Sequence, residues 1–478
     1  LVPGGILNNG FALSWIEHVY KRAAPYGQGW EQGRVDAGDT ICEENQLLHD
    51  QRVNNVEQAK DTAYYRPEVI APLDPSAFAH EIEVPVFLGG AWQDEQTGPF
   101  FFTLLNRFTS SPSRRFLVYN GVHPDGFAPQ VFVEWKAFLD IYVARSKPAV
   151  GGFLALLVPQ VTNQIYGVSL EMPADRWKGV ASYEEARAKW EAEPELVAFF
   201  GNGAPEPLGT PQGNFSLAFD GWPPAQTEAS RLYFQPDGSL AVDLPGAGTP
   251  ASSFRLDPTA GERGVLAKGS KLWTALPAYD WKAPATGDVV AFTSAPLDSD
   301  QVMLGSGSVD LWLRSPAADV TDADLEVNLT EVRADGQEVY VQSGWLRASF
   351  RSLTAAATEL WPEPALLQAK SEPLVPGEWH SVRIAIAAFG HVFRQGSRIR
   401  IAVDTPGDSR VDWRFDLQKY DHEVYYHVGH SPDYPSSVAL PRLAGVAVPA
   451  GAVVPACPSL RGQPCRGFVG GANVAAEP

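Results

Sequence analysis

The segment from Val84 to Gly126 constrains the fold more than any other part of the chain. Its sequence, VPVFLGGAWQDEQTGPFFFTLLNRFTSSPSRRFLVYNGVHPDG, contains two short apolar runs without polar alternation, one before Asp94 and one before His123. Such runs are typical of parallel strands that are buried on both faces of a sheet. Open α/β sheets carry their sites beyond the carboxyl ends of parallel strands. We therefore expect Asp94 and His123 to meet at one edge of a sheet.

The residues after His123 predict a helix that covers this sheet. In PQVFVEWKAFLDIYVARSKP the apolar positions form one helical face, and Pro148 closes the unit. Strand, helix, strand and helix in succession are typical of a parallel βαβ sheet. Only two strands are evident, and two parallel strands alone would leave both faces and one edge exposed to water. We therefore expect a segment outside this chain to supply the rest of the sheet.

The regions on either side of this sheet differ in periodicity. Phe11, Trp15, Val19 and Ala23 recur at helical spacing, which predicts either a helical lid or a plain helical subdomain. From about residue 216, apolar and polar residues alternate between turns, as in an antiparallel sandwich or jelly roll. The expected regions are a helical cap (1–80), the later part of an α/β domain (81–149), a helical insert and connector (150–215), a jelly-roll β-sandwich (216–446) and an extended tail (447–478).

Length, charge and composition narrow the class of protein. A chain of 478 residues is too long for one hydrophobic core, so we expect two or three domains. The net charge of -19 argues against nucleic acid or an anionic membrane as a partner, because both are negatively charged. No apolar run approaches the roughly 20 residues of a membrane-spanning helix. P-loop, GxGxxG, HExxH and CxxC patterns are absent from the sequence, so we expect no cofactor.

The spacing of the cysteines indicates in which cellular compartment the protein is expected to work. Cys457 and Cys465 flank the short loop CPSLRGQPC, which could close a disulfide in an oxidising compartment, whereas Cys42 has no evident partner. Three reduced thiols are an equally good interpretation of the spacing. We interpret Leu1 as a processed terminus or a boundary, beyond which any targeting signal lies. With the disulfide formed, the expected location is secreted or extracytoplasmic.

A histidine with a carboxylate beside it predicts the base and the orienting acid of a nucleophilic hydrolase. Histidine suits the role of base because its ordinary pKa of about 6.5 lies near working pH. The spacing of 29 positions between Asp94 and His123 leaves room for one helix, in the acid-then-histidine order of an α/β-hydrolase. The structural alternative is that Asp94 caps a helix and His123 lies in a turn. Of the rival carboxylates, Glu95 points the other way in an extended chain, and Asp125 is too close in sequence to reach behind the ring easily.

The nucleophile is not evident in this chain. The G-x-S-x-G elbow does not occur, and Ser306 in LGSGSVD lies among alternating strands rather than between a strand and a helix. We therefore expect the serine and the oxyanion donors upstream of Leu1. His422, His427 and His430 could in principle bind a metal, but their spacing matches no zinc signature, so an aromatic-packed structural loop is the preferred interpretation.

Several segments resemble, in order, the cocaine-esterase and X-prolyl dipeptidyl-peptidase family of serine hydrolases. PGGILNNGFALSW is similar to the start of its cap, VPVFLGGAWQDEQTG to the strand and loop of its catalytic aspartate, and NGVHPDG to its histidine loop. FDGWPPAQTEASRLYFQPDGSL and the strands through YPSSVALP resemble its C-terminal jelly roll. The resemblance covers most of residues 1–446 and corresponds to the later two thirds of the family's chain. AWQDEQ and YNGVHPDG depart from the family's loops, which are closer to Gly-Trp-Tyr-Asp and Gly-Pro-Trp-Ser-His.

The resemblance implies a fold that is α/β plus all-β: the C-terminal part of an α/β-hydrolase domain with a helical cap, then a jelly-roll β-sandwich. It implies a carboxylic-ester hydrolase in which Asp94 is the triad acid and His123 is the general base. The serine would come from an N-terminal segment of the same gene product, which we expect as a partner beside a small ester or short peptide substrate.

Four further residues are candidate substrate contacts, although cap aromatics are more often packing residues: Gln93, Glu95, Trp15 and Trp30. One alternative is an X-prolyl or aminoacyl peptidase with the same triad, for which Glu95 is a weak ligand for the substrate's ammonium group. The other is a non-catalytic fragment that binds carbohydrate or protein through the sandwich.

Overall fold

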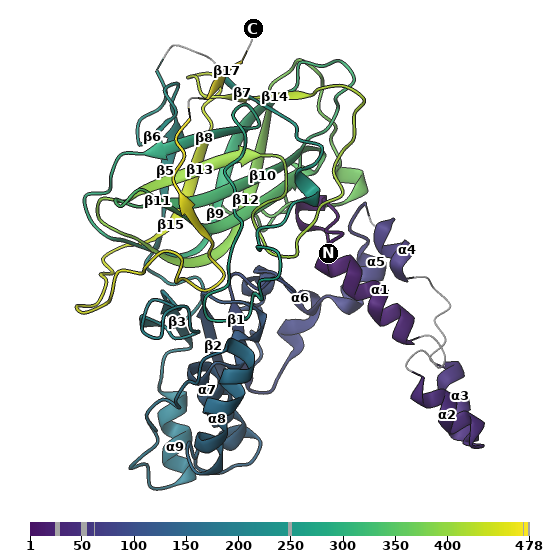
Figure 1. Cartoon of the computed structure of the whole chain (residues 1–478), viewed down its shortest axis with the longest axis vertical. Helices are drawn as coiled ribbons and strands as arrows, with labels where there is room; N and C mark the ends of the chain where they lie inside the picture. Colours follow the sequence, from purple (N-terminus) through teal and green to yellow (C-terminus); the bar gives the residue numbers. More distant parts are fainter. Residues whose placement is uncertain (24–28, 49–54, 62, 247–250, 472, 477–478) are drawn as a thin grey trace.

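The computed structural model describes residues 1–23, 29–48, 55–61, 63–246, 251–471 and 473–476. These residues form a group of short N-terminal helices, a small sheet with covering helices, and a large β-sandwich (Figure 1). The predicted α/β part followed by a β-sandwich is therefore confirmed at the level of architecture. The jelly-roll path of the sandwich stays a prediction.

The N-terminal helices begin a region that extends away from the sandwich. They are α1 (Phe11–Ala23), α2 (Trp30–Asp36), α3 (Thr40–Leu48), α4 (Asn55–Lys60), α5 (Pro67–Ile70) and α6 (Pro75–Phe78). Leu13 of α1 packs against Val56 and Ala59 of α4, while α2 and α3 lie farther out (Figure 1). The later part of the predicted helical cap is described by α3 and α4 on either side of 49–54, which lie outside the described residues. A lid function for this region stays a prediction.

The small sheet has four strands in the order β1–β2–β3–β4. They are β1 (Val86–Ala91), β2 (Arg114–Tyr119), β3 (Leu196–Phe200) and β4 (Phe215–Phe219). β1, β2 and β3 run parallel, and β4 is antiparallel to β3. Our expectation of only two strands is wrong, because the apolar run LVAFF beyond Pro194 forms β3, which pairs with β2. The boundary that we placed at residue 216 falls inside β4. No described strand pairs with the outer edge of β1.

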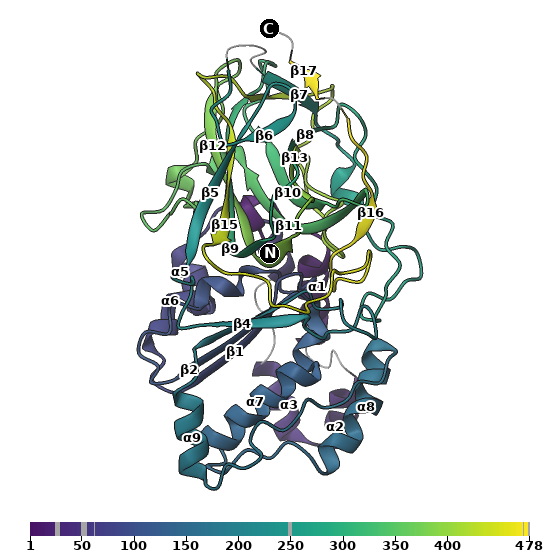
Figure 2. The ribbon, with the colours of Figure 1, turned by 90° about the vertical axis from the view of Figure 1, so that its left-hand side faces the viewer.

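Alternate residues of the small sheet face two different layers. The helices of this region are α7 (Pro129–Tyr142), α8 (Phe153–Tyr166) and α9 (Tyr183–Glu191). Leu117 and Tyr119 of β2 pack against Val131 of α7, which confirms the predicted covering helix. Phe116 and Val118 face the opposite layer, which includes residues of the sandwich. The sheet therefore lies between α7 and the sandwich, as Figure 2 shows. None of the described helices combines the length and the apolar character needed to cross a membrane.

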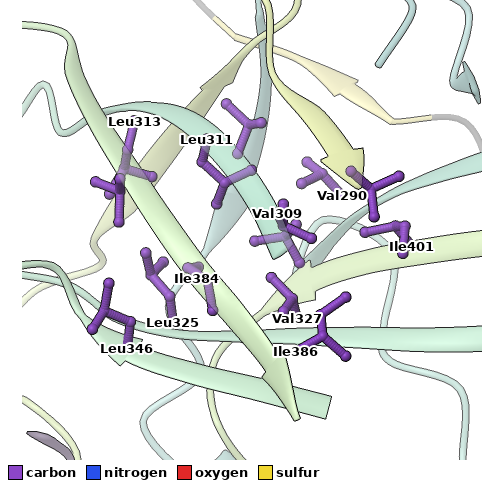
Figure 3. Close-up of a cluster of buried hydrophobic side chains, with 14 of the residues drawn as sticks. Val290, Val309, Leu311, Leu313, Leu325, Val327, Leu346, Ile384, Ile386 and Ile401 are labelled. Carbon is purple, nitrogen blue, oxygen red and sulfur yellow. The ribbon is translucent and has the colours of Figure 1, made fainter. Parts of the chain in front are cut away.

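The sandwich is built from strands of very different length, nearly all of them paired antiparallel. Its strands are β5 (Thr227–Phe234), β6 (Ser239–Ala241), β7 (Ala251–Arg255), β8 (Val289–Ser294), β9 (Gln301–Arg314), β10 (Asp324–Val332), β11 (Gln337–Arg347), β12 (His380–Phe393), β13 (Arg398–Asp404), β14 (Tyr425–Gly429), β15 (Ser437–Leu443), β16 (Cys465–Gly467) and β17 (Val474–Ala475). Side chains of β9 and β12 interdigitate with those of β10 and β13 in one buried aliphatic core (Figure 3). Burying these branched residues is the main stabilising contribution to this part of the fold.

The tail after residue 446 lies along the sandwich. β16 pairs with β11, and β17 pairs with β7, so the tail is held by main-chain hydrogen bonds. A disulfide joins Cys457 and Cys465, whose Cα atoms are 5.9 Å apart, and Cys42 is a buried free thiol. Of the two interpretations of the cysteine spacing, the structure contains the disulfide.

The environment of His427 in β14 leads us to expect that acid lowers the free energy of unfolding of the sandwich. Arg314 Nη2 donates to its Nδ1 over 3.0 Å, so this ring nitrogen has to remain unprotonated. Burial, and then the Arg314 charge, lower the pKa of His427 from 6.5 to about 4. Because the folded-state pKa is lower than the unfolded one, the stabilisation is present above pH 6.5 and is lost as pH falls towards about 4. We expect a loss of about 1–2 kcal/mol after solvent screening.

Thermal melting of wild type and of His427→Asn between pH 7 and pH 4 measures this acid-dependent loss of stability. The asparagine keeps an oxygen that can accept from Arg314 but does not titrate, so its melting temperature should fall less steeply with acid. His80→Asn is the matched control, because the His80 side chain is 58% exposed. Parallel curves for wild type and His427→Asn would contradict the prediction.

Candidate active site

The loop after β1 holds the Asp94 carboxylate in a fixed orientation. Asp94 Oδ1 accepts hydrogen bonds from the backbone N–H groups of Gln96, at 2.8 Å, and Thr97, at 2.9 Å. Two residues of the sandwich hold the same loop from outside. Arg410 Nη2 donates to the Asp94 carbonyl over 2.7 Å, and Trp413 Nε1 donates to the Glu95 carbonyl over 3.0 Å. The sandwich, which we call the second domain, thus holds the Asp94 loop in place. Asp94 Oδ2 faces the loop that follows β2.

The loop after β2 brings the His123 ring to that oxygen. His123 Nδ1 lies 2.9 Å from Asp94 Oδ2. The histidine side chain is 42% exposed, whereas that of Asp94 is 12% exposed. No hydrogen bond joins His123 Nε2 to any other residue in the described part of the chain. The two residues that the sequence placed at one sheet edge are therefore brought together, with the buried carboxylate behind the ring and Nε2 left available.

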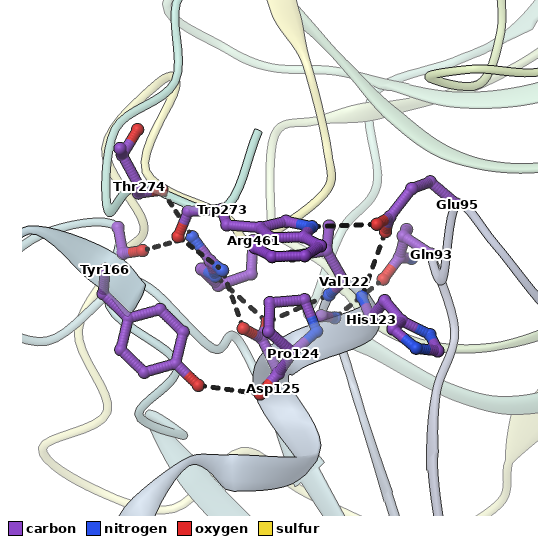
Figure 4. A network of polar contacts seen from close by, with 12 residues as sticks. Gln93, Glu95, Val122, His123, Pro124, Asp125, Tyr166, Trp273, Thr274 and Arg461 are labelled. Atoms are coloured by element: carbon purple, nitrogen blue, oxygen red, sulfur yellow. Dashed lines mark hydrogen bonds and ion pairs between the residues drawn. The ribbon is translucent and has the colours of Figure 1, made fainter. Parts of the chain in front are cut away.

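Glu95, the first rival carboxylate, holds the backbone of the histidine loop. Its Oε2 accepts from the His123 N–H over 3.0 Å, and its Oε1 accepts from Trp273 Nε1 over 2.9 Å (Figure 4). Glu95 is 3% exposed, and both of its carboxylate oxygens are engaged. Its side chain is directed towards the main chain of His123 and the indole of Trp273 rather than into solvent.

Asp125, the second rival, faces away from the imidazole. Both of its oxygens bind Arg461, with Nε to Oδ2 at 3.0 Å and Nη2 to Oδ1 at 2.7 Å (Figure 4). Asp125 Oδ2 also accepts from the Val122 N–H over 2.9 Å. Asp94 is therefore the carboxylate that contacts the His123 ring, while Glu95 and Asp125 hold the backbone of its loop.

The structure does not bring the other candidate contacts together. Gln93 is 5% exposed, and its side chain accepts from the Gly121 N–H at 3.1 Å and donates to the Val341 carbonyl at 3.3 Å. Trp15 lies on α1 and Trp30 on α2, both more than half exposed, and α2 is far from β1 and β2 in Figure 1. Substrate contact by these residues stays a prediction.

Three tyrosines that are buried or half-buried lie near Asp125 in the histidine loop. Burial, together with the negative charge of Asp125, raises the pKa of Tyr119 and of Tyr166. Burial and the nearby carboxylates also raise the pKa of Tyr279, although Arg461 opposes this. These phenols stay protonated at working pH. Tyr166 uses its hydroxyl to donate to the Pro124 carbonyl over 2.9 Å, which adds a further hold on the loop.

The three histidines between residues 422 and 430 each have a separate partner. His422 lies beside Asp421, His427 accepts from Arg314, and His430 Nε2 lies 2.9 Å from Ser252 Oγ. Among the residues that the structure describes, no group of three or more His, Cys, Asp or Glu side chains is arranged to hold a metal. Ser306 is in β9, inside the sandwich and remote in the fold from a strand-to-helix elbow.

Sequence reasoning missed the residues that brace the two loops from a distance. Arg410, Trp413 and Trp273 come from the second domain, and Arg461 comes from the tail. Their contacts join positions more than 170 residues apart, and no local pattern signals such pairings. The one available signal was the spacing of the two cysteines in CPSLRGQPC. This spacing indicates an ordered loop, but it does not indicate which part of the molecule the loop contacts.

Comparison with known proteins finds similarity to parts of several hydrolases. Residues 188–420 match the family model described as the X-Pro dipeptidyl-peptidase C-terminal non-catalytic domain, a range that excludes Asp94 and His123. Two proteins that carry the name "putative serine esterase", from Mycobacterium bovis and Mycobacterium tuberculosis, are 29% identical over 193 residues. This match covers 38% of the present chain and 29% of each relative.

Two solved structures share the fold across both domains. A CocE/NonD family hydrolase from Staphylococcus aureus aligns with a TM-score of 0.59 at 14% identity, over 92% of this chain and 64% of that one. An α-amino acid ester hydrolase aligns with a TM-score of 0.51 at 14% identity, over 84% of this chain and 62% of that one. The chain thus spans less than two thirds of the proteins that it matches.

Proposed function

Since the chain belongs to the cocaine-esterase and X-prolyl dipeptidyl-peptidase (CocE/NonD) family of hydrolases, we propose that it carries the acid and the base of a serine carboxylic-ester hydrolase. The observation that supports this most directly is the 2.9 Å contact between His123 Nδ1 and Asp94 Oδ2. The two residues lie just past adjacent parallel strands, where α/β sheets place their sites.

Each group has a defined role in this proposal. His123 Nε2 takes the proton of the nucleophilic serine as the serine attacks the acyl carbon, and then returns it to the leaving oxygen. Asp94 accepts from Nδ1–H, which keeps Nε2 as the basic nitrogen and stabilises the imidazolium ion that forms. The loop contacts of Glu95 and Arg410 require no reorganisation free energy during turnover, because they are already formed in the folded chain.

We further propose that the serine is supplied by a segment upstream of Leu1 that extends the small sheet. Two observations support this: the chain has no G-x-S-x-G elbow, and no described strand occupies the outer edge of β1. A strand added there would end at the same sheet edge as Asp94 and His123. Intact mass and N-terminal sequencing of the purified material test it; a fully active, monodisperse chain of 51.9 kDa would contradict it.

A peptidase with the same two residues is the second candidate, favoured by the match to an X-Pro dipeptidyl-peptidase domain. Such an enzyme needs a free carboxylate for the substrate's ammonium group, and both oxygens of Glu95 are already engaged. We therefore expect the full-length protein to hydrolyse a p-nitrophenyl acyl ester faster than an X-Pro p-nitroanilide. Faster anilide turnover would favour the peptidase, and failure to hydrolyse either substrate or to react with a fluorophosphonate would contradict a serine hydrolase.

A further inference from the structure

The disulfide-closed loop of the tail, residues 457–465, inserts one arginine beneath the histidine loop. Arg461 is in the middle of this loop, and its side chain is 1% exposed. An arginine is rarely buried to this extent unless each of its N–H groups has a partner. Specific interactions therefore have to keep Arg461 buried beside Asp125 rather than at the surface.

On one side, Arg461 secures the turn that precedes His123. The Asp125 side chain is 0% exposed, and the guanidinium binds both of its oxygens. Asp125 in turn accepts from the Val122 N–H over 2.9 Å. Burial by itself lowers the pKa of Arg461, but the Asp125 carboxylate outweighs this, so the pKa is raised and the pair stays charged. Without the arginine, a buried carboxylate would be left unpaired beside the histidine loop.

On the other side, Arg461 holds the segment that reaches His123 through Glu95. Its Nη1 donates to the Thr274 carbonyl over 2.7 Å, next to Trp273 in the chain. Trp273 donates to Glu95, and Glu95 accepts from the His123 N–H. Figure 4 shows these contacts on both sides of the loop. The guanidinium thus supports Val122 and His123 from two directions.

The tail loop is itself fitted closely to the two domains. The Arg461 N–H donates to the Asn202 carbonyl over 3.0 Å, and Gln463 accepts from Asn120 at 3.0 Å and donates to the Tyr340 carbonyl at 2.8 Å. Gly462 has a φ of 70°, and a Cβ there would lie 2.6 Å from the Gln93 side chain. Closure of the loop by a disulfide limits the conformations from which Arg461 must be delivered.

We propose that Arg461 is a positioning residue for the proposed general base, and that the loop 457–465 exists to deliver it. The inference rests on the role proposed for His123. Arg461 touches no reacting atom; it keeps the backbone of residues 122 and 123 in place, so that the ring stays directed at Asp94 on one side and at the serine on the other. Misplacement of a catalytic group by about 1 Å can cost about 100-fold in rate.

Kinetics of the full-length protein test this with two substitutions and a matched control. We expect Arg461→Gln to lower kcat for a p-nitrophenyl ester by about 10- to 100-fold while KM changes by less than about 3-fold, because the base and not the substrate site is displaced. Arg461→Lys should recover part of kcat, since the charge beside Asp125 is kept. Arg466→Gln is the control, because Arg466 lies in the same tail and pairs with Glu338 of β11 rather than with Asp125.

Hydrogen exchange separates this inference from the proposed function, because it needs no catalysis. The N–H groups of Val122 and His123 should exchange at least about 10-fold faster in Arg461→Gln and in Cys457→Ser/Cys465→Ser than in Arg466→Gln. The double cysteine variant keeps Arg461 and Asp125, so it tests delivery by the loop even if Arg461→Gln does not fold. An inactive wild type with this exchange pattern would refute the proposed function and leave the anchoring intact. An active wild type, with kcat and exchange within about 2-fold in all variants, would overturn the inference.

Discussion

Replacing His123 with glutamine is expected to lower kcat/KM for a p-nitrophenyl ester by about 10,000-fold in the full-length protein. The reason is that glutamine keeps a polar side chain of similar length but cannot take a proton from serine. The backbone contact between the His123 N–H and Glu95 does not involve the ring, so the loop should keep its conformation. Steady-state hydrolysis and fluorophosphonate labelling measure the effect, and both should fall together.

His18→Gln is the control for this experiment, because His18 is exposed on α1 and touches neither loop. Its activity should equal that of wild type. If His123→Gln retained more than about a tenth of the wild-type rate while wild type was labelled normally, His123 could not be the general base.

Replacing Asp94 with asparagine is expected to have an effect of similar size, about 10,000-fold on kcat. An amide at this position presents N–H as readily as oxygen to the ring, so His123 Nδ1 would act as acceptor and Nε2 would carry the proton. The wrong nitrogen would then face the serine. The turn contacts from Gln96 and Thr97 use the other carboxylate oxygen, so the loop itself should persist.

Asp140→Asn is the matched control for the acid, because Asp140 pairs with Lys136 on the outer side of α7. The nitrogen-15 chemical shifts of the His123 ring report its tautomer without any need for catalysis. An Asp94→Asn protein with the wild-type tautomer and near wild-type kcat would show that the 2.9 Å contact is not functional.

Local patterns in the sequence predicted the elements that carry the reacting groups. The unbroken apolar runs before Asp94 and His123 predicted β1 and β2, and the helical face after His123 predicted α7. The same reasoning missed β3, because the short run LVAFF lies in the region 150–215, which we expected to be a helical insert and connector. Only pairing with β2 makes this run a strand, and strand pairing is a long-range interaction that local composition does not encode.

Glu95 and Gln93 lie next to the proposed catalytic residues in the loop after β1. Their residue types alone could not show whether they contact substrate or hold the backbone. Glu95 was a candidate both for substrate contact and as a rival triad acid, yet its side chain is buried against the His123 main chain and Trp273. Gln93 is similarly occupied by main-chain groups. Direction of a side chain depends on the turn that follows the strand, and that turn is set by contacts with Arg410 and Trp413 from the second domain.

The sequence by itself determined that Asp94 and His123 follow two short parallel strands, because the length and apolar character of each strand are local properties. Only the tertiary structure decided which carboxylate meets the ring and what keeps it there. The braces come from Arg410, Trp273 and Arg461, which reach the site only after the sandwich and the tail have folded against the small sheet. Their pairing depends on surfaces that residues far apart in the chain form together, and so no local pattern could reveal it.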